Sequence, residues 1–240
     1  MPTQIERLEA LSSHLLDGFL KLRERYALLE PMLFEPKVAA TRGSKKQARG
    51  FSTLRHSLFL TCAQDIAKYT TDSDHRTPSI RNIVAALEDQ QLLASLREKY
   101  AIWHCPLAEN ETDPEILEAL QRMNLREEAE RRSQFDEHYR ELVALWNKLS
   151  ATPEMEAYRT VRDKLTAHTE VRLVADKYQL IDIGSLGIKW GHLKTTISEM
   201  QRSVELIGLI VRNAGFAWDA LDRQLTEAAQ GFWYEVGAAS

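Results

Sequence analysis

An arginine and a histidine six positions apart are the side chains of this sequence best suited to chemistry. Arg162 and His168 lie in segment 153–170, PEMEAYRTVRDKLTAHTE. An imidazole exchanges protons near neutral pH, and a guanidinium stays charged and can bind two phosphate oxygens at once. Together they meet the needs of RNA cleavage without a metal. These are removal of the 2′-hydroxyl proton, neutralisation of charge on the phosphate and protonation of the leaving 5′-oxygen.

The spacing alone has no value as evidence, because the same Arg-x4-6-His window recurs along the chain. The other matches are Arg7/His14, Arg49/His56, Arg97/His104, Arg131/His138 and Arg132/His138. Arg162 differs in that a polar residue, Asp163, follows it directly. Judged by spacing only, the simpler interpretation is that Arg162 pairs with Asp163 or a nearby glutamate and that His168 borders the core.

A helix over 153–170 must position both side chains. Pro153 suits the first helical position and Thr152 the N-cap. The apolar residues recur at three- and four-residue steps and form one stripe toward a neighbouring helix: Met155, Tyr158, Val161 and Leu165. At about 100° per residue, Arg162 lies roughly 65° to one side of this stripe and His168 roughly 55° to the other. We therefore expect both to border a packed seam that also serves as a dimer interface.

The phrase from Arg162 to His168 resembles the motif of the HEPN superfamily, whose arginine is usually followed by Asn, Asp or His. Two upstream phrases are similar to the abortive-infection U-type (AbiU-like) branch of that superfamily, so the resemblance covers most of the chain. They are Gly50-Phe51-x-x-Leu54-Arg55 and Asp74-His75-Arg76-Thr77-Pro78-Ser79-Ile80. In this sequence Thr169 and Glu170 follow the histidine, so the tyrosine that one toxin branch carries two residues after it is missing.

The resemblance implies an all-α helical bundle, with a HEPN-type four-helix core and additional N- and C-terminal helices. It also implies a homodimer in which two Arg/His pairs form one metal-independent endoribonuclease site of a toxin or abortive-infection defence protein. Arg162 and His168 take the catalytic roles and Asp163 the supporting one, with Arg159 and Lys164 placed to hold flanking phosphates. RNA is the expected substrate, and an antitoxin or regulatory protein is a further partner. The alternative is a catalytically inactive HEPN-like binding module, or a scaffold for RNA or a protein partner.

One stretch is strongly basic in a chain whose net charge is −4. No acidic residue occurs over 37–64, and the stretch contains Lys37, Arg42, Lys45, Lys46, Arg49 and Arg55. Such a stretch is typical of a surface that contacts the phosphate backbone, and Lys45, Lys46 and Arg49 are the candidate substrate-binding residues. The same composition also describes a solvated loop and helix face.

The composition argues against a disulfide-rich secreted protein and against a membrane protein. With 44% hydrophobic and 28% charged residues, 10 glycines and 7 prolines, the chain is typical of a helical, soluble protein. Its only cysteines, Cys62 and Cys105, lie far apart, which indicates packing thiols in a reducing cytoplasm. We expect no metal site, no cofactor, no signal peptide and no membrane span.

The resemblance implies a single HEPN-like helical domain over 1–240, although the length alone allows one large or two small domains. Segment 171–189 is expected to form a packed loop with a short hairpin. The charged middle of the fourth helix, 126–134, predicts a projecting helical arm around 113–149 that faces solvent or a partner. The predicted helices span about 3–30, 52–69, 77–100, 113–148, 153–170, 190–213 and 216–229.

Overall fold

The computed structural model describes residues 3–106, 112–166, 171–174, 177–180 and 186–234. Apart from one small hairpin, the described elements are helical. They are α1 (Gln4–Phe34), α2 (Pro36–Arg42), the 3₁₀ turn η1 (Lys45–Gln47), α3 (Ala48–Thr71), α4 (Ile80–Ala86), α5 (Gln90–Ala101), α6 (Pro114–Ser150), α7 (Pro153–Thr160), the π-helical turn η3 (Val161–Thr166), β1 (Val171–Val174), β2 (Lys177–Leu180), α8 (Trp190–Arg212) and α9 (Trp218–Tyr234).

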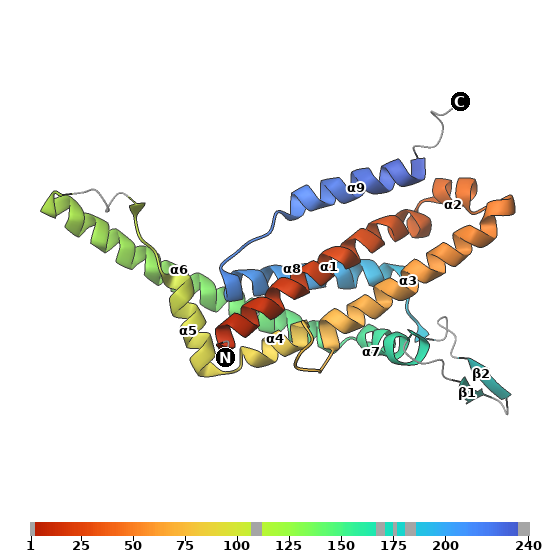
Figure 1. The fold of residues 1–240 in the computed structure, drawn as a ribbon, viewed down its shortest axis with the longest axis horizontal. Helices are drawn as coiled ribbons and strands as arrows, with labels where there is room; N and C mark the ends of the chain where they lie inside the picture. The colour runs from red at the N-terminus through yellow and green to blue at the C-terminus, as the bar shows by residue number, and fades with distance from the viewer. Residues whose placement is uncertain (1–2, 107–111, 167–170, 175–176, 181–185, 235–240) are drawn as a thin grey trace.

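Long helices form the bundle (Figure 1). α1 packs along both α3 and α8, and α8 also contacts α6. α9 covers α1, while α7 and η3 lie against α3. This is the all-α bundle expected from the sequence, with helices added to a central set.

The core follows the apolar spacing of the two central helices. Seven apolar residues recur along α1 at three- and four-residue steps, from Leu8 to Leu29. Leu11 is partly buried, and the other six are buried: Leu8, Leu15, Phe19, Leu22, Tyr26 and Leu29. α8 is buried most fully in its second half, where Leu206, Ile207, Ile210 and Val211 are at most 2% exposed. Phe19 meets Trp218 edge to face, with ring centroids 5.8 Å apart, and so joins α1 to α9. Burial of these side chains is the main stabilising contribution.

The prediction of a single helix over 77–100 is wrong, because this segment forms two helices, α4 and α5. α4 ends at Ala86 and α5 begins at Gln90. The carboxylate of Asp89 accepts hydrogen bonds from the backbone N–H groups of Gln91 and Leu92, at 2.9 and 3.2 Å. An aspartate in this position starts a new helix, and the chain changes direction there.

The first half of α6 extends away from the bundle (Figure 1), and the buried residues of the helix lie in its second half: Phe135, Leu142 and Leu149. Two arginines of its charged middle contact α5 and the residues just after it, while Arg126, Glu130 and Gln134 are exposed to solvent as expected. Arg132 donates to Glu98 at 2.8 Å. Arg131 lies over the rings of Tyr100 and Trp103.

The hairpin expected within 171–189 is confirmed. β1 and β2 pair antiparallel, with Val171 opposite Leu180 and Val174 opposite Lys177. No helix in the described part of the chain combines the length and apolar content of a membrane span.

Candidate functional site

The motif helix is α-helical only at its start. α7 ends at Thr160, and Val161–Thr166 form a π-helical turn. The prediction of one regular α-helix to Glu170 is therefore wrong over Val161–Thr166, and residues 167–170 lie outside the described part. A π-turn carries an extra residue per turn, so the angles derived from an α-helix do not apply after it. π-helical turns are rare in proteins, and a large share of those that do occur lie at functional sites.

The predicted apolar stripe is buried within its own subunit. Met155, Tyr158 and Val161 are fully enclosed, and the hydroxyl of Thr70 in α3 approaches the sulfur of Met155 at 3.5 Å. The side chain of Leu165 lies outside the described part. Because α3 already covers this stripe, the stripe is not available as a dimer interface. A second subunit would have to meet the flanks of α7 and η3 instead.

Arg162 lies at the border of this buried stripe, with 25% of its side chain exposed. Its Nε donates to Oδ1 of Asp163 at 2.6 Å. Its Nη1 lies 3.5 Å from Oδ2 of Asp72, at the end of α3. The hydrogen bond to Asp163 raises the pKa of Arg162, so the guanidinium stays charged. Two carboxylates from different segments thus hold the cation of the motif.

Asp72 was not predicted as a site residue. It caps α3 and begins the connection to α4, and its second carboxylate oxygen, Oδ1, accepts from the backbone N–H of Asp74 at 3.0 Å. The hydroxyl of Ser79 donates to the Asp72 carbonyl at 2.8 Å. These bonds fix Asp72 so that Oδ2 faces Arg162. The signal in the sequence is the pattern Asp72-x-Asp74-x-Arg76, typical of a turn built on aspartate side chains.

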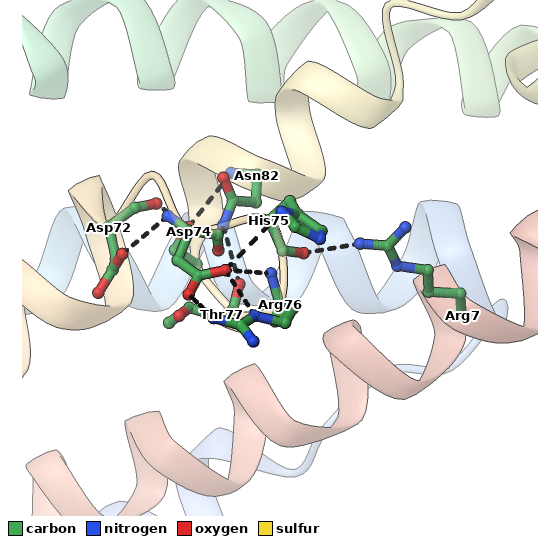
Figure 2. A network of polar contacts seen from close by, with 8 residues as sticks. Arg7, Asp72, Asp74, His75, Arg76, Thr77 and Asn82 are labelled. Atoms are coloured by element: carbon green, nitrogen blue, oxygen red, sulfur yellow. Dashed lines mark hydrogen bonds and ion pairs between the residues drawn. The ribbon is translucent and has the colours of Figure 1, made fainter.

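The rest of the α3–α4 connection is a dense polar network (Figure 2). Arg76 donates to Asp74 through Nε and Nη2, at 3.1 and 2.7 Å. Nδ2 of Asn82 bridges the carbonyls of Asp74 and Thr77, at 2.7 and 2.9 Å. Arg7 of α1 donates to the carbonyl of His75 at 2.8 Å. The segment 74–80 that carries the AbiU-like phrase is therefore tied to α1 and α4 and adjoins the residue that faces Arg162.

The other predicted substrate-binding residues fall into two groups. Arg159 and Lys164 belong to α7 and η3, close in sequence to Arg162, and Arg159 pairs with Glu156 at 3.2 Å. Lys46 lies in η1 and Arg49 in the first turn of α3. At 1.5 Å per residue, the 23 residues from Arg49 to Asp72 span about 35 Å.

The structure therefore places the basic stretch relative to Arg162, but it does not place the predicted catalytic histidine. Within one chain, the basic stretch lies at the opposite end of α3 from Arg162. The side chain of Lys45 is outside the described part. His168 also lies outside the described residues, so its position relative to Arg162 stays a prediction. Among the described residues, no group of His, Cys, Asp and Glu side chains is arranged to hold a metal ion.

The Asp74 network predicts a pH-dependent contribution to stability. The Arg76 side chain holds the pKa of the Asp74 carboxyl well below its usual range. A carboxyl whose pKa is lower in the folded state stabilises the fold above its unfolded pKa of about 3.9, and this contribution is lost as the pH falls toward the folded pKa. Asp74→Asn should therefore lower the urea midpoint at pH 7, and the difference from wild type should shrink steadily toward pH 2. A difference that stays constant with pH would show that charge on Asp74 plays no part.

A protein-family model described as AbiU2, of the HEPN class, matches residues 5–232. No curated protein matches the chain, and no solved structure matches it. The family match includes α1 through most of α9, and with it the α3–α4 connection, Arg162 and His168. The chain therefore belongs to the AbiU2 family of the HEPN superfamily.

Proposed function

We propose that the chain is a metal-independent endoribonuclease, and that two copies form a composite Arg/His site in a homodimer. The observation that carries this proposal is the fixation of Arg162. Its guanidinium is held by Asp163 and Asp72 at the edge of the core, with a quarter of the side chain open to solvent. A cation oriented in advance stabilises developing phosphate charge better than a freely moving one, because little reorganisation is needed during the reaction.

The proposed reaction balances with side chains alone. One His168 removes the proton of a 2′-hydroxyl, and the resulting oxygen attacks the adjacent phosphorus. The bond from phosphorus to the 5′-oxygen breaks, and a second imidazole donates a proton to the leaving oxygen. Arg162 neutralises charge on the non-bridging oxygens. The products are a 2′,3′-cyclic phosphate and a free 5′-hydroxyl.

Two subunits serve this mechanism because base and acid act on opposite sides of the phosphorus. One imidazole cannot easily reach both sides of an in-line displacement, whereas two copies related by a twofold axis can. The exposed flank of α7 and η3 is available for this contact. Glu156 is 73% exposed and Asp163 53% exposed, while the buried stripe behind them anchors the flank to α3.

The biological role that fits such an enzyme is that of a toxin or abortive-infection defence protein. RNA is the substrate, and an antitoxin or regulatory protein would keep the activity in check. Lys45, Lys46 and Arg49 would contact the RNA backbone away from the cleaved bond.

One observation favours a second candidate, an inactive HEPN-like binding module or scaffold. Asp72 and Asp163 together offset the charge of Arg162, which is also what a purely structural ion-pair cluster would do. In that case the chain would bind RNA or a protein partner without cleaving it.

The mechanism predicts that cleavage survives removal of divalent ions. Purified protein should cut RNA at an unchanged rate in excess EDTA, because imidazole and guanidinium supply the acid, base and positive charge. The cut ends should carry 2′,3′-cyclic phosphate, measured by their resistance to phosphatase before mild acid treatment and their sensitivity afterward. Cleavage that EDTA abolishes and a divalent ion restores would contradict the mechanism.

A further inference from the structure

A hollow lies about 30 Å from Asp72, judged from the rise along α3. Three segments line this open hollow: the α2–η1 region, the first turns of α3 and the last turn of α9. Its volume is about 660 Å³, within the range of small-ligand pockets. The segments are far apart in the sequence, so the pocket exists only in the folded chain.

Apolar and aromatic side chains form the walls. Phe51 and Trp233 are 9% and 7% exposed and meet edge to face, with ring centroids 6.1 Å apart. The indole N–H of Trp233 donates to the carbonyl of Leu28 at 3.0 Å, which fixes the ring. Phe232 and Leu54 form an exposed rim, at 55% and 40% exposure. The pocket is thus rigid at its back and presents apolar surface to solvent.

The charge around the pocket is positive. Arg42 and Lys46 belong to the lining, and no carboxylate is among the described residues that line it. Arg55 lies over the rings of Phe51 and Trp190, at 5.8 and 5.2 Å from their centroids. This cation–π pairing keeps a third positive charge beside the pocket. An occupant that matches these features has a flat apolar part and carries negative charge.

We propose that this pocket takes an unpaired base of a single-stranded RNA, with Arg42 and Lys46 on the adjacent phosphates. The inference rests on the proposed ribonuclease function and names its substrate class. Stacking on aromatic rings tolerates any base, and cations follow the backbone, which is how single strands are bound without sequence preference. Bases in a duplex are stacked on one another and do not enter such a pocket. An apolar protein segment would leave the three cations unmatched.

Gly50 offers a direct way to test the pocket. It lies in the first turn of α3 and lines the pocket, and a Cβ added there meets no atom within 4 Å. Gly50→Leu therefore places a side chain in the open space at the pocket wall and narrows the pocket without displacing a packed side chain. Because leucine favours a helix more than glycine does, the melting temperature should not fall. Gly215→Leu is the matched control, since a Cβ at Gly215, in the α8–α9 connection, also meets open space.

The experiment measures binding of a fluorescent single-stranded RNA and of the same sequence as a duplex, using protein with His168→Ala so that the RNA stays intact. Gly50→Leu should weaken single-strand binding at least about tenfold, the equivalent of one lost stacking contact. Duplex binding and the Gly215→Leu control should not change. Lys46→Gln should reduce the slope of log affinity against log salt by about one.

The outcomes separate this inference from the proposed function. Unchanged single-strand binding by Gly50→Leu overturns the inference, even where wild-type protein cleaves RNA. A changed oligomeric state with unchanged RNA binding also overturns it, since the pocket is then a subunit contact. Loss of single-strand binding in Gly50→Leu supports the pocket even where wild-type protein cleaves nothing, and in that case the ribonuclease proposal fails alone.

Discussion

Replacing His168 with alanine is expected to lower RNA cleavage by about 10²- to 10⁴-fold, the range attributed to general acid–base catalysis. The imidazole is the only group in the proposed mechanism that exchanges protons near neutral pH, so both proton transfers depend on it. Purified wild type and His168→Ala would be compared under single-turnover conditions. Expression of the two proteins in cells, followed by growth and RNA integrity, asks whether the same residue causes toxicity.

The chain supplies a matched control for this variant. Arg132 and His138 have the same spacing as Arg162 and His168, but they lie on the regular helix α6. Arg132 binds Glu98, and His138 lies with its ring 6.4 Å from that of Tyr100. His138→Ala should therefore leave cleavage unchanged. Equal activity of wild type and His168→Ala would remove the catalytic role of His168 and favour the inactive binding module.

Much of the fold could be predicted because apolar spacing reports directly on which helix face is buried. The positions of Leu8, Leu11, Leu15, Phe19 and Leu22 at three- and four-residue steps predict the buried face of α1; Leu11 is partly buried and the other four are buried. The break at Asp89 was missed although the pattern is interrupted there, because no apolar residue occurs over 88–91 and the step from Leu87 to Leu92 is five residues. The hydrogen bonds of the Asp89 carboxylate to the next turn then mark the new helix start.

The candidate site was predicted only where its partners are close in sequence. Asp163 follows Arg162 directly, and their contact was anticipated from that adjacency. Asp72 is ninety residues away, and its approach to Arg162 depends on how α3 packs against α7 and η3. The π-turn at Val161–Thr166 was also missed, because helical periodicity in a short segment does not distinguish i→i+4 from i→i+5 hydrogen bonding.

Burial of the motif stripe narrows the ways in which two subunits can meet. An interface centred on Val161 is excluded, since Val161 is fully enclosed by its own subunit. The flank that carries Asp163 stays open, and it borders Arg162. A twofold axis beside this flank would bring the two Arg162 side chains near one another. We therefore expect each Arg162 to work with His168 of the partner.

Pairing across the axis predicts that two inactive variants restore activity when combined. Homodimers of Arg162→Ala and of His168→Ala each lack every intact Arg/His pair. A mixed dimer keeps His168 on one chain and Arg162 on the other, so one of the two pairings across the axis is intact. Random mixing makes half of the dimers mixed. Each mixed dimer keeps one imidazole for the two proton transfers, so the restored activity should exceed that of either homodimer but stay well below one quarter of wild type. Co-expression with two affinity tags yields mixed dimers whose cleavage rate can be measured directly.

A second mixed dimer distinguishes pairing across the axis from pairing within one chain. Wild type combined with the double variant Arg162→Ala, His168→Ala keeps an intact pair within the wild-type chain and none across the axis. We expect this mixed dimer to be nearly inactive, while the dimer of the two single variants is active, because the pairing across the axis survives only in the latter. The reverse order of activities would place each Arg/His pair within one subunit, and the dimer would then not be needed to assemble the site.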